Sequence, residues 1–136
     1  DEVKFNLAVS LHSAIQETRE QIMPFAKNFT LPDLRESLEY WYSKTKRKIT
    51  YEYIVWKDIN DKWADIEALV TFCKYVPCKV NIIEYNPIDD GHFQQASSIV
   101  IDDYIQALEH DRIPVTVRRS RGKDIDAACG QLANKQ

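Results

Sequence analysis

The sequence alternates four times between strand-like and helix-like segments, and this alternation constrains its fold more than any other feature. The strand-like segments are 4–12, 48–56, 78–86 and 113–119, and the helix-like segments are 14–23, 30–46, 60–76 and 97–111. Regular alternation predicts βα units around a parallel sheet, with crossovers that are nearly always right-handed. The sequence therefore predicts an α/β fold, either an open doubly wound sheet or an arc of a barrel.

Start and stop signals support these segments. Pro24 stops the first helix, and Thr30 with Pro32 in the first turn predicts the start of the second. Asn60 or Asp61 is the expected cap of the third helix. The first strand is expected to be buried and parallel, since it is short and largely apolar.

A chain of 136 residues with 44% apolar residues suits one domain, residues 1–136, with a packed core. No apolar run approaches the roughly 20 residues of a membrane span, and no signal peptide is visible, so we expect a cytoplasmic protein without a membrane partner. The chain starts without methionine and almost at once in a strand-like pattern, which favours a fragment of a longer protein.

The net charge of −3 does not itself indicate a nucleic-acid-binding protein, but its distribution is uneven. Residues 112–123 contain five basic residues and no acidic one, and residues 44–48 hold a second basic run. Either patch could bind nucleic acid. No glycine occurs before position 91, which excludes the glycine-rich loops of dinucleotide and phosphate-loop sites.

In βα folds the functional groups lie where strands end. Ser10 and His12 follow the first strand and are expected to face the same way, and Asn86 ends the third. Each has a structural alternative: His12 as a satisfied core histidine and Asn86 as a turn residue before proline. Glu52 fits a polar strand face better than a catalytic role.

The three cysteines have neither disulfide-framework nor zinc-site spacing, so no metal site is expected in this chain. Cys73 and Cys78 occupy apolar positions and are expected to be inert core residues. Cys129 lies among small residues beside arginines that would favour its thiolate. A reactive cysteine and an accidental exposed one fit this setting equally well.

Five stretches, in this order, are similar to the C-terminal half of the RlmN/Cfr family of radical S-adenosylmethionine methyltransferases, which act on an adenine of 23S ribosomal RNA. They are "NLAVSLHS", "IMPFAKNF", "TYEYIVWKDIND", "PCKVNIIEYNP" and "IPVTVRRSRGKDIDAACGQL". The similarity runs through nearly the whole chain and implies half of a partial (βα) barrel, with about four mainly parallel strands and the helices outside.

The resemblance also implies site residues. Ser10, Leu11, His12 and Asn86 would contact S-adenosylmethionine, and Cys129 would carry the methyl group as a methylated cysteine on a mobile tail, residues 119–136. Contacts to RNA phosphates are expected from Arg118, Arg119 and Arg121. A [4Fe–4S] cluster would produce the radical that activates the methyl carbon.

The cluster motif CxxxCxxC is absent from this sequence, so the cluster ligands would lie elsewhere in a full-length enzyme and this chain alone should be inactive. We expect methylation at adenine C2, with a Cfr-type C8 enzyme as the alternative, and transfer RNA as a further substrate stays open. The competing hypotheses are a non-catalytic RNA-binding module of the same fold and another radical enzyme. An exposed sheet edge or an exposed sheet face predicts a homodimer of the isolated chain.

Overall fold

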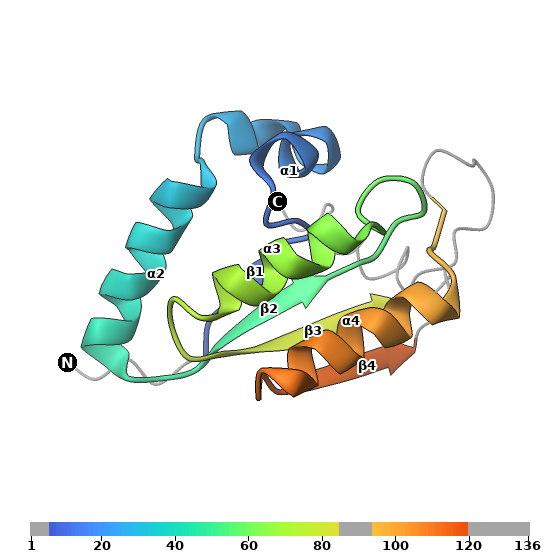
Figure 1. Ribbon diagram of the computed structural model, residues 1–136. Helices are drawn as coiled ribbons and strands as arrows, with labels where there is room; N and C mark the ends of the chain where they lie inside the picture. The colour runs from blue at the N-terminus through green and yellow to red at the C-terminus, as the bar shows by residue number, and fades with distance from the viewer. Residues whose placement is uncertain (1–5, 85–93, 120–136) are drawn as a thin grey trace.

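One four-stranded sheet organises the molecule, and the computed structural model describes it through residues 6–84 and 94–119 (Figure 1). The elements in chain order are β1 (Ala8–Ser10), α1 (Gln16–Ile22), the 3-10 helix η1 (Pro24–Lys27), α2 (Leu31–Thr45), β2 (Ile49–Tyr53), α3 (Trp63–Cys73), β3 (Cys78–Glu84), α4 (Ser98–His110) and β4 (Val115–Arg119). Every neighbouring strand pair is parallel, which confirms the predicted α/β class.

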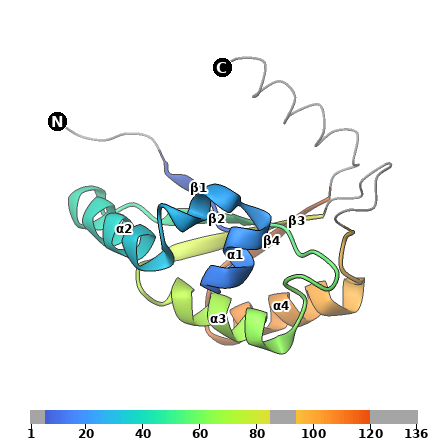
Figure 2. The same ribbon diagram turned by 90° about the horizontal axis from the view of Figure 1, so that it is seen from above.

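Strand order decides between the two architectures left open by the sequence. The strands follow one another as β1-β2-β3-β4, with no reversal of direction along the sheet. Helices α3 and α4 lie on the same side of the sheet in both views (Figures 1 and 2). A doubly wound sheet reverses its strand order and carries helices on both faces, whereas a barrel adds strands in sequence with the helices outside. The observed sheet is therefore the arc of a barrel.

The core lies between the sheet and these two helices. Alternate residues of β2 and β3 are buried: Ile49, Tyr51, Tyr53, Cys78, Val80 and Ile82. Tyr51 packs on Phe72 of α3 with ring centroids 5.6 Å apart, and Tyr53 packs on Tyr104 of α4 at 5.3 Å. Because side chains alternate along a strand, the intervening residues point to the opposite face, where Thr50, Glu52 and Asn81 stay partly exposed.

Several local predictions change in the structure. Thr30 is confirmed as the cap of α2: its Oγ1 accepts from the Asp33 N–H at 3.4 Å and its own N–H donates to Asp33 Oδ2 at 3.1 Å. The cap of α3 is Lys62, so neither Asn60 nor Asp61 caps it. The prediction of a buried first strand is wrong, since Ala8 and Ser10 are exposed on the outermost strand. Among the described residues, no helix is long and apolar enough to cross a membrane.

Candidate functional site

The first strand ends directly in the "SLH" segment. Ser10 is the last residue of β1, Leu11 is fully buried and donates its N–H to the Glu52 carbonyl at 3.0 Å, and His12 is half-buried. The segment thus lies at the carboxyl edge of the sheet, where barrel folds hold their functional groups. The strand ends at Ser10 and His12 has a positive φ, so the alternation on which their expected common facing rests does not extend to His12.

His12 stands at the centre of a tight turn. Its φ is 59°, and the Ser13 N–H donates to the Leu11 carbonyl at 2.7 Å across it. A residue other than glycine pays a steric cost in this left-handed region, although histidine enters it more readily than most. Such a conformation persists only where the surroundings hold it in place.

Two side chains hold the three carbonyls of this segment. Arg19 reaches from α1 and donates from Nη2 to the Ser10 carbonyl at 3.3 Å and from Nε to the Leu11 carbonyl at 3.1 Å. Asn60 donates from Nδ2 to the His12 carbonyl at 2.7 Å. Arg19 is 4% exposed and Asn60 is 0% exposed, so neither bond competes with bulk water.

Asn60 also ties the loop after β2 to α4. Its Nδ2 donates to the Ile54 carbonyl at 3.0 Å, and its Oδ1 accepts from the Trp56 N–H at 2.6 Å. The Tyr104 hydroxyl donates to the Asn60 carbonyl at 2.6 Å and lies 3.0 Å from the Tyr53 hydroxyl. Burial raises the pKa of both tyrosines, so they remain neutral hydrogen-bonding groups.

The imidazole of His12 is fixed as well. Its Nδ1 accepts a hydrogen bond from the Ile54 N–H at 3.1 Å. Burial and the nearby positive charge of Arg19 lower the pKa of His12 to about 4, so the ring is neutral near pH 7. A neutral imidazole that accepts at Nδ1 carries its proton on Nε2.

A row of polar residues crosses the sheet face that α3 and α4 do not cover. In register, Ser10 lies beside Glu52, Glu52 beside Asn81 and Asn81 beside Thr116. The Thr116 hydroxyl donates to Asn81 Oδ1 at 3.1 Å, and Asn81 Nδ2 donates to Glu52 Oε2 at 2.9 Å. Glu52 is therefore a member of a polar strand ladder, as the sequence favoured, and this ladder lies next to Ser10.

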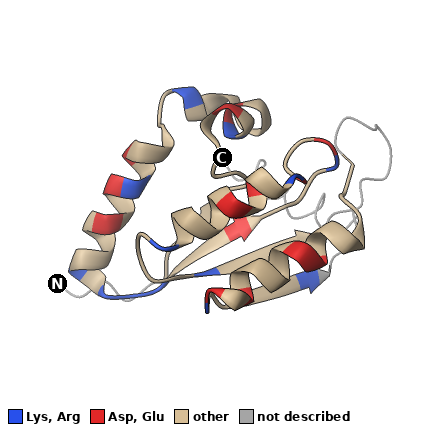
Figure 3. Ribbon diagram, in the orientation of Figure 1, with Lys and Arg blue, Asp and Glu red and all other residues tan. Residues whose placement is uncertain are grey.

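The basic residues fall on opposite edges of the sheet. Arg118 is exposed near the end of β4, at the carboxyl edge, and Arg119 ends that strand (Figure 3). The run Lys44–Lys48 precedes β2 and so lies at the amino edge. Arg112 also precedes its strand and lines a pocket at the amino edge together with Lys48, so the basic residues of 112–119 are divided between the two edges. Asn86, Arg121, Cys129 and nearly all of the predicted tail lie outside the described residues.

The two remaining cysteines are buried, as expected. Cys73 is 4% exposed and Cys78 is 5% exposed, and the Cys78 thiol donates to the Cys73 carbonyl at 3.4 Å. Hydrogen bonding to Cys78 and burial raise the pKa of Cys73. Because the thiolate is the reactive form, Cys73 is inert in this setting.

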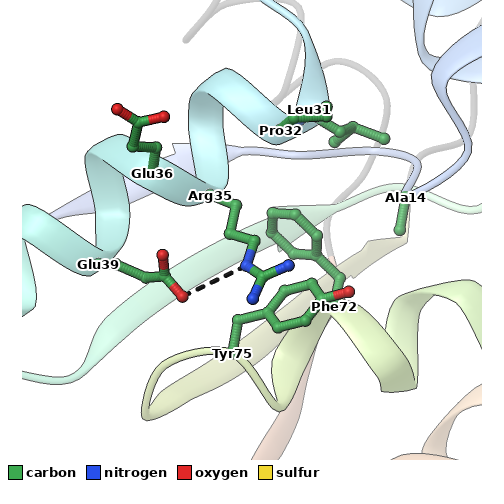
Figure 4. A pocket seen from close by; sticks show the side chains of 8 residues that line it. All are labelled: Ala14, Leu31, Pro32, Arg35, Glu36, Glu39, Phe72 and Tyr75. Carbon is green, nitrogen blue, oxygen red and sulfur yellow. Dashed lines mark hydrogen bonds and ion pairs between the residues drawn. The ribbon is translucent and has the colours of Figure 1, made fainter.

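A cavity of about 400 Å³ opens between α2 and α3 (Figure 4). Leu31 and Phe72 contribute apolar surface to it. The Arg35 guanidinium lies 3.7 Å from the ring centre of Tyr75 and 3.3 Å from Glu39 Oε2. The positive charge in this cavity is thus already paired, and the carboxyl-edge turn is the stronger candidate site.

Sequence reasoning missed the residues that build this turn. Arg19 sits in a helix among other charged residues, where a solvent-facing role is the usual one. Asn60 fits a helix cap by type and position. The neighbouring sequence does not distinguish a solvent-facing arginine or a helix-capping asparagine from residues that bond the carbonyls of the turn. These carbonyls lie 8 and 9 residues from Arg19 and 48 residues from Asn60.

The sequence of this chain is similar to those of several RNA methyltransferases. No protein-family model matches the chain. A protein of Flavobacterium johnsoniae described as "Probable dual-specificity RNA methyltransferase RlmN" is 74% identical over all 136 residues. Proteins of the same description from Salinibacter ruber and Clostridium botulinum are 47% and 42% identical over 99% and 96% of the chain. The chain spans 37 to 39% of the length of these relatives.

Two solved structures share the fold. A radical SAM methyltransferase from Sphaerobacter thermophilus is 34% identical with a TM-score of 0.85, over 96% of this chain and 38% of that protein. A domain of pyruvate-formate lyase-activating enzyme from Bacteroides vulgatus matches 82% of this chain and 65% of its own length, with a TM-score of 0.62. At 18% identity, the second match shows the fold alone.

Proposed function

We infer that this chain is one part of a radical S-adenosylmethionine RNA methyltransferase of the RlmN/Cfr family, and on that premise we propose that it builds the methyl-carrying side of the active site. The observation that carries the proposal is the match over the whole chain to RNA methyltransferases at up to 74% identity. The reaction we propose for the full-length enzyme is methylation of an adenine of 23S ribosomal RNA at C2.

The residues at the carboxyl edge fit S-adenosylmethionine chemically. The cofactor has ribose hydroxyls, adenine nitrogens and a carboxylate that accept or donate hydrogen bonds. Ser10 offers a hydroxyl on the exposed end of β1, and His12 offers a neutral ring nitrogen beside it. When bound, the cofactor supplies the methyl group and, with a [4Fe–4S] cluster held by other parts of the enzyme, a radical.

Cys129 is the proposed methyl carrier. Its thiolate would attack the methyl carbon of S-adenosylmethionine, so that the bond from the sulfonium to the methyl group breaks and S-adenosylhomocysteine leaves, while the thiolate becomes a neutral thioether. Arg118, Arg119 and Arg121 precede it in the sequence, and their positive charges favour the thiolate and attract RNA phosphates. Arg118 is exposed at the edge where β1 also ends, so RNA held by this arginine would approach the cofactor side of the sheet.

Adenine methylation by full-length enzyme tests the proposal. The reconstituted enzyme is incubated anaerobically with S-adenosylmethionine carrying a labelled methyl group and with a 23S ribosomal RNA transcript. Digestion to nucleosides and mass spectrometry should then give labelled 2-methyladenosine. Labelled 8-methyladenosine would instead identify a Cfr-type enzyme. RNA binding without any methyl transfer would favour the non-catalytic module, and a transfer RNA substrate in parallel shows whether specificity is dual.

A further inference from the structure

The "SLH" turn has an internal support that the proposed function does not require. Each of its three carbonyls is bonded by a side chain from another element, with Arg19 on Ser10 and Leu11 and Asn60 on His12. Arg19 and Asn60 are both buried polar side chains. The two converge on three consecutive residues.

The His12 ring contacts the residue that follows β2. The backbone at His12 is left-handed, and in this conformation its Nδ1 accepts from the Ile54 N–H, with 3.1 Å between the two nitrogens. Asn60 contacts the same loop, because its Nδ2 bonds both the His12 and Ile54 carbonyls. The backbone of His12 and its ring are therefore held against one short stretch of chain.

The remaining ring nitrogen has a defined chemical character. With Nδ1 accepting from a backbone N–H, the proton of the neutral ring is on Nε2. No hydrogen bond joins Nε2 to the described part of the chain. A half-buried N–H donor without a partner at a strand end is suited to an acceptor atom on a ligand.

We propose that Arg19 and Asn60 are positioning residues that hold His12 in its left-handed turn, so that its Nε2–H donates a hydrogen bond to an acceptor atom of S-adenosylmethionine. The inference rests on the proposed function, which assigns the cofactor to this segment. It adds the direction of the hydrogen bond and the residues that fix it. In this role His12 is a binding donor and takes no proton during the reaction.

His12→Asn separates the roles of the two ring nitrogens, because it keeps an acceptor in place of Nδ1 and removes the donor at Nε2. The asparagine Oδ1 replaces Nδ1 as acceptor for the Ile54 N–H, and asparagine tolerates φ near 59°, so the turn should persist. The variant lacks the Nε2 donor. Calorimetric binding of S-adenosylmethionine to the full-length enzyme should weaken about three- to tenfold, the effect of one lost neutral hydrogen bond. The thermal unfolding midpoint should stay close to that of the parent enzyme.

Arg19→Lys tests positioning by a double-mutant cycle. Alone, it should weaken cofactor binding, since lysine cannot hold both carbonyls with the geometry of a guanidinium. In the His12→Asn background it should cause no further loss, because its effect passes through His12. Arg35→Lys, at an exposed arginine that lines the cavity between α2 and α3, is the matched control and should leave binding unchanged. Additive losses would overturn the positioning role of Arg19.

The tautomer of His12 can be measured in the parent enzyme, without any substitution. Nitrogen-15 spectra of histidine-labelled full-length enzyme should show His12 protonated at Nε2 and bare at Nδ1 near neutral pH. A proton on Nδ1, or unchanged cofactor affinity in His12→Asn, would refute this inference while the proposed function stands. Failure of the parent enzyme to bind S-adenosylmethionine would remove both.

Discussion

Asn60 donates a 2.7 Å hydrogen bond to the backbone carbonyl of His12 and so joins two loops that are 48 residues apart in the sequence. One loop follows β1 and the other follows β2, and both lie at the carboxyl edge of the sheet. The bond is the shortest of the three side-chain hydrogen bonds to the carbonyls of Ser10, Leu11 and His12. Stability and the geometry of the candidate site thus depend on the same buried amide.

Asn60→Ala should destabilise the protein by about 3 kcal/mol or more, because it leaves two carbonyls and the Trp56 N–H buried without this partner. Chemical denaturation followed by circular dichroism measures the change. Asn28→Ala, at an exposed position after η1, is the matched control and should change stability by less than about 0.5 kcal/mol. Equal effects of the two substitutions would contradict the network.

Stability should fall with pH through the range in which His12 titrates. The folded pKa of about 4 lies below the unfolded value of about 6.5, so the unfolded chain binds more protons between these values. The contribution is therefore present above pH 6.5 and is lost as the pH falls to 4. Its size is on the order of 1–2 kcal/mol after allowance for partial exposure. In unfolding measurements from pH 7.5 to 4, His12→Asn should have the shallower pH dependence.

Cys129→Ala should abolish methyl transfer to RNA in the full-length enzyme, because alanine cannot carry a methyl group. Cys73→Ala should keep the activity and lose about 1 kcal/mol of stability, since Cys73 is a small buried side chain in the core. Transfer of labelled methyl to RNA and thermal unfolding distinguish the two roles. Normal turnover by the Cys129→Ala enzyme would be incompatible with the carrier assignment.

The isolated 136-residue chain should self-associate, because β1 and β4 are the outer strands of the described sheet. Leu7 and Leu11 bond β2 through their backbones, so the alternate residue Ala8 directs its N–H to the open edge. Ala8→Pro removes that donor without cutting a β1–β2 bond and should lower the apparent mass in light scattering at high concentration. A monomeric parent chain would show that its edges are protected.

Much of the fold was predictable from local patterns. The Thr30 and Pro32 signals placed the start of α2 correctly, and the apolar positions of Cys73 and Cys78 predicted their burial. These features depend on side-chain period and on neighbours along the chain. The short exposed β1 was mispredicted as buried, because apolar composition does not reveal whether a strand lies at the edge of a sheet.

The sequence by itself determined the α/β class and the parallel pairing through alternating periodicity, and the resemblance to the RlmN/Cfr family through five ordered motifs. Only the tertiary structure decided that the sheet is an arc of a barrel, that His12 is left-handed, and that Arg19 and Asn60 hold it. The physical reason is that a hydrogen bond between distant residues requires their backbones to be brought within 3 Å or so, and packing alone does this. Residue type sets what Asn60 can donate, and the fold sets the carbonyl to which it donates.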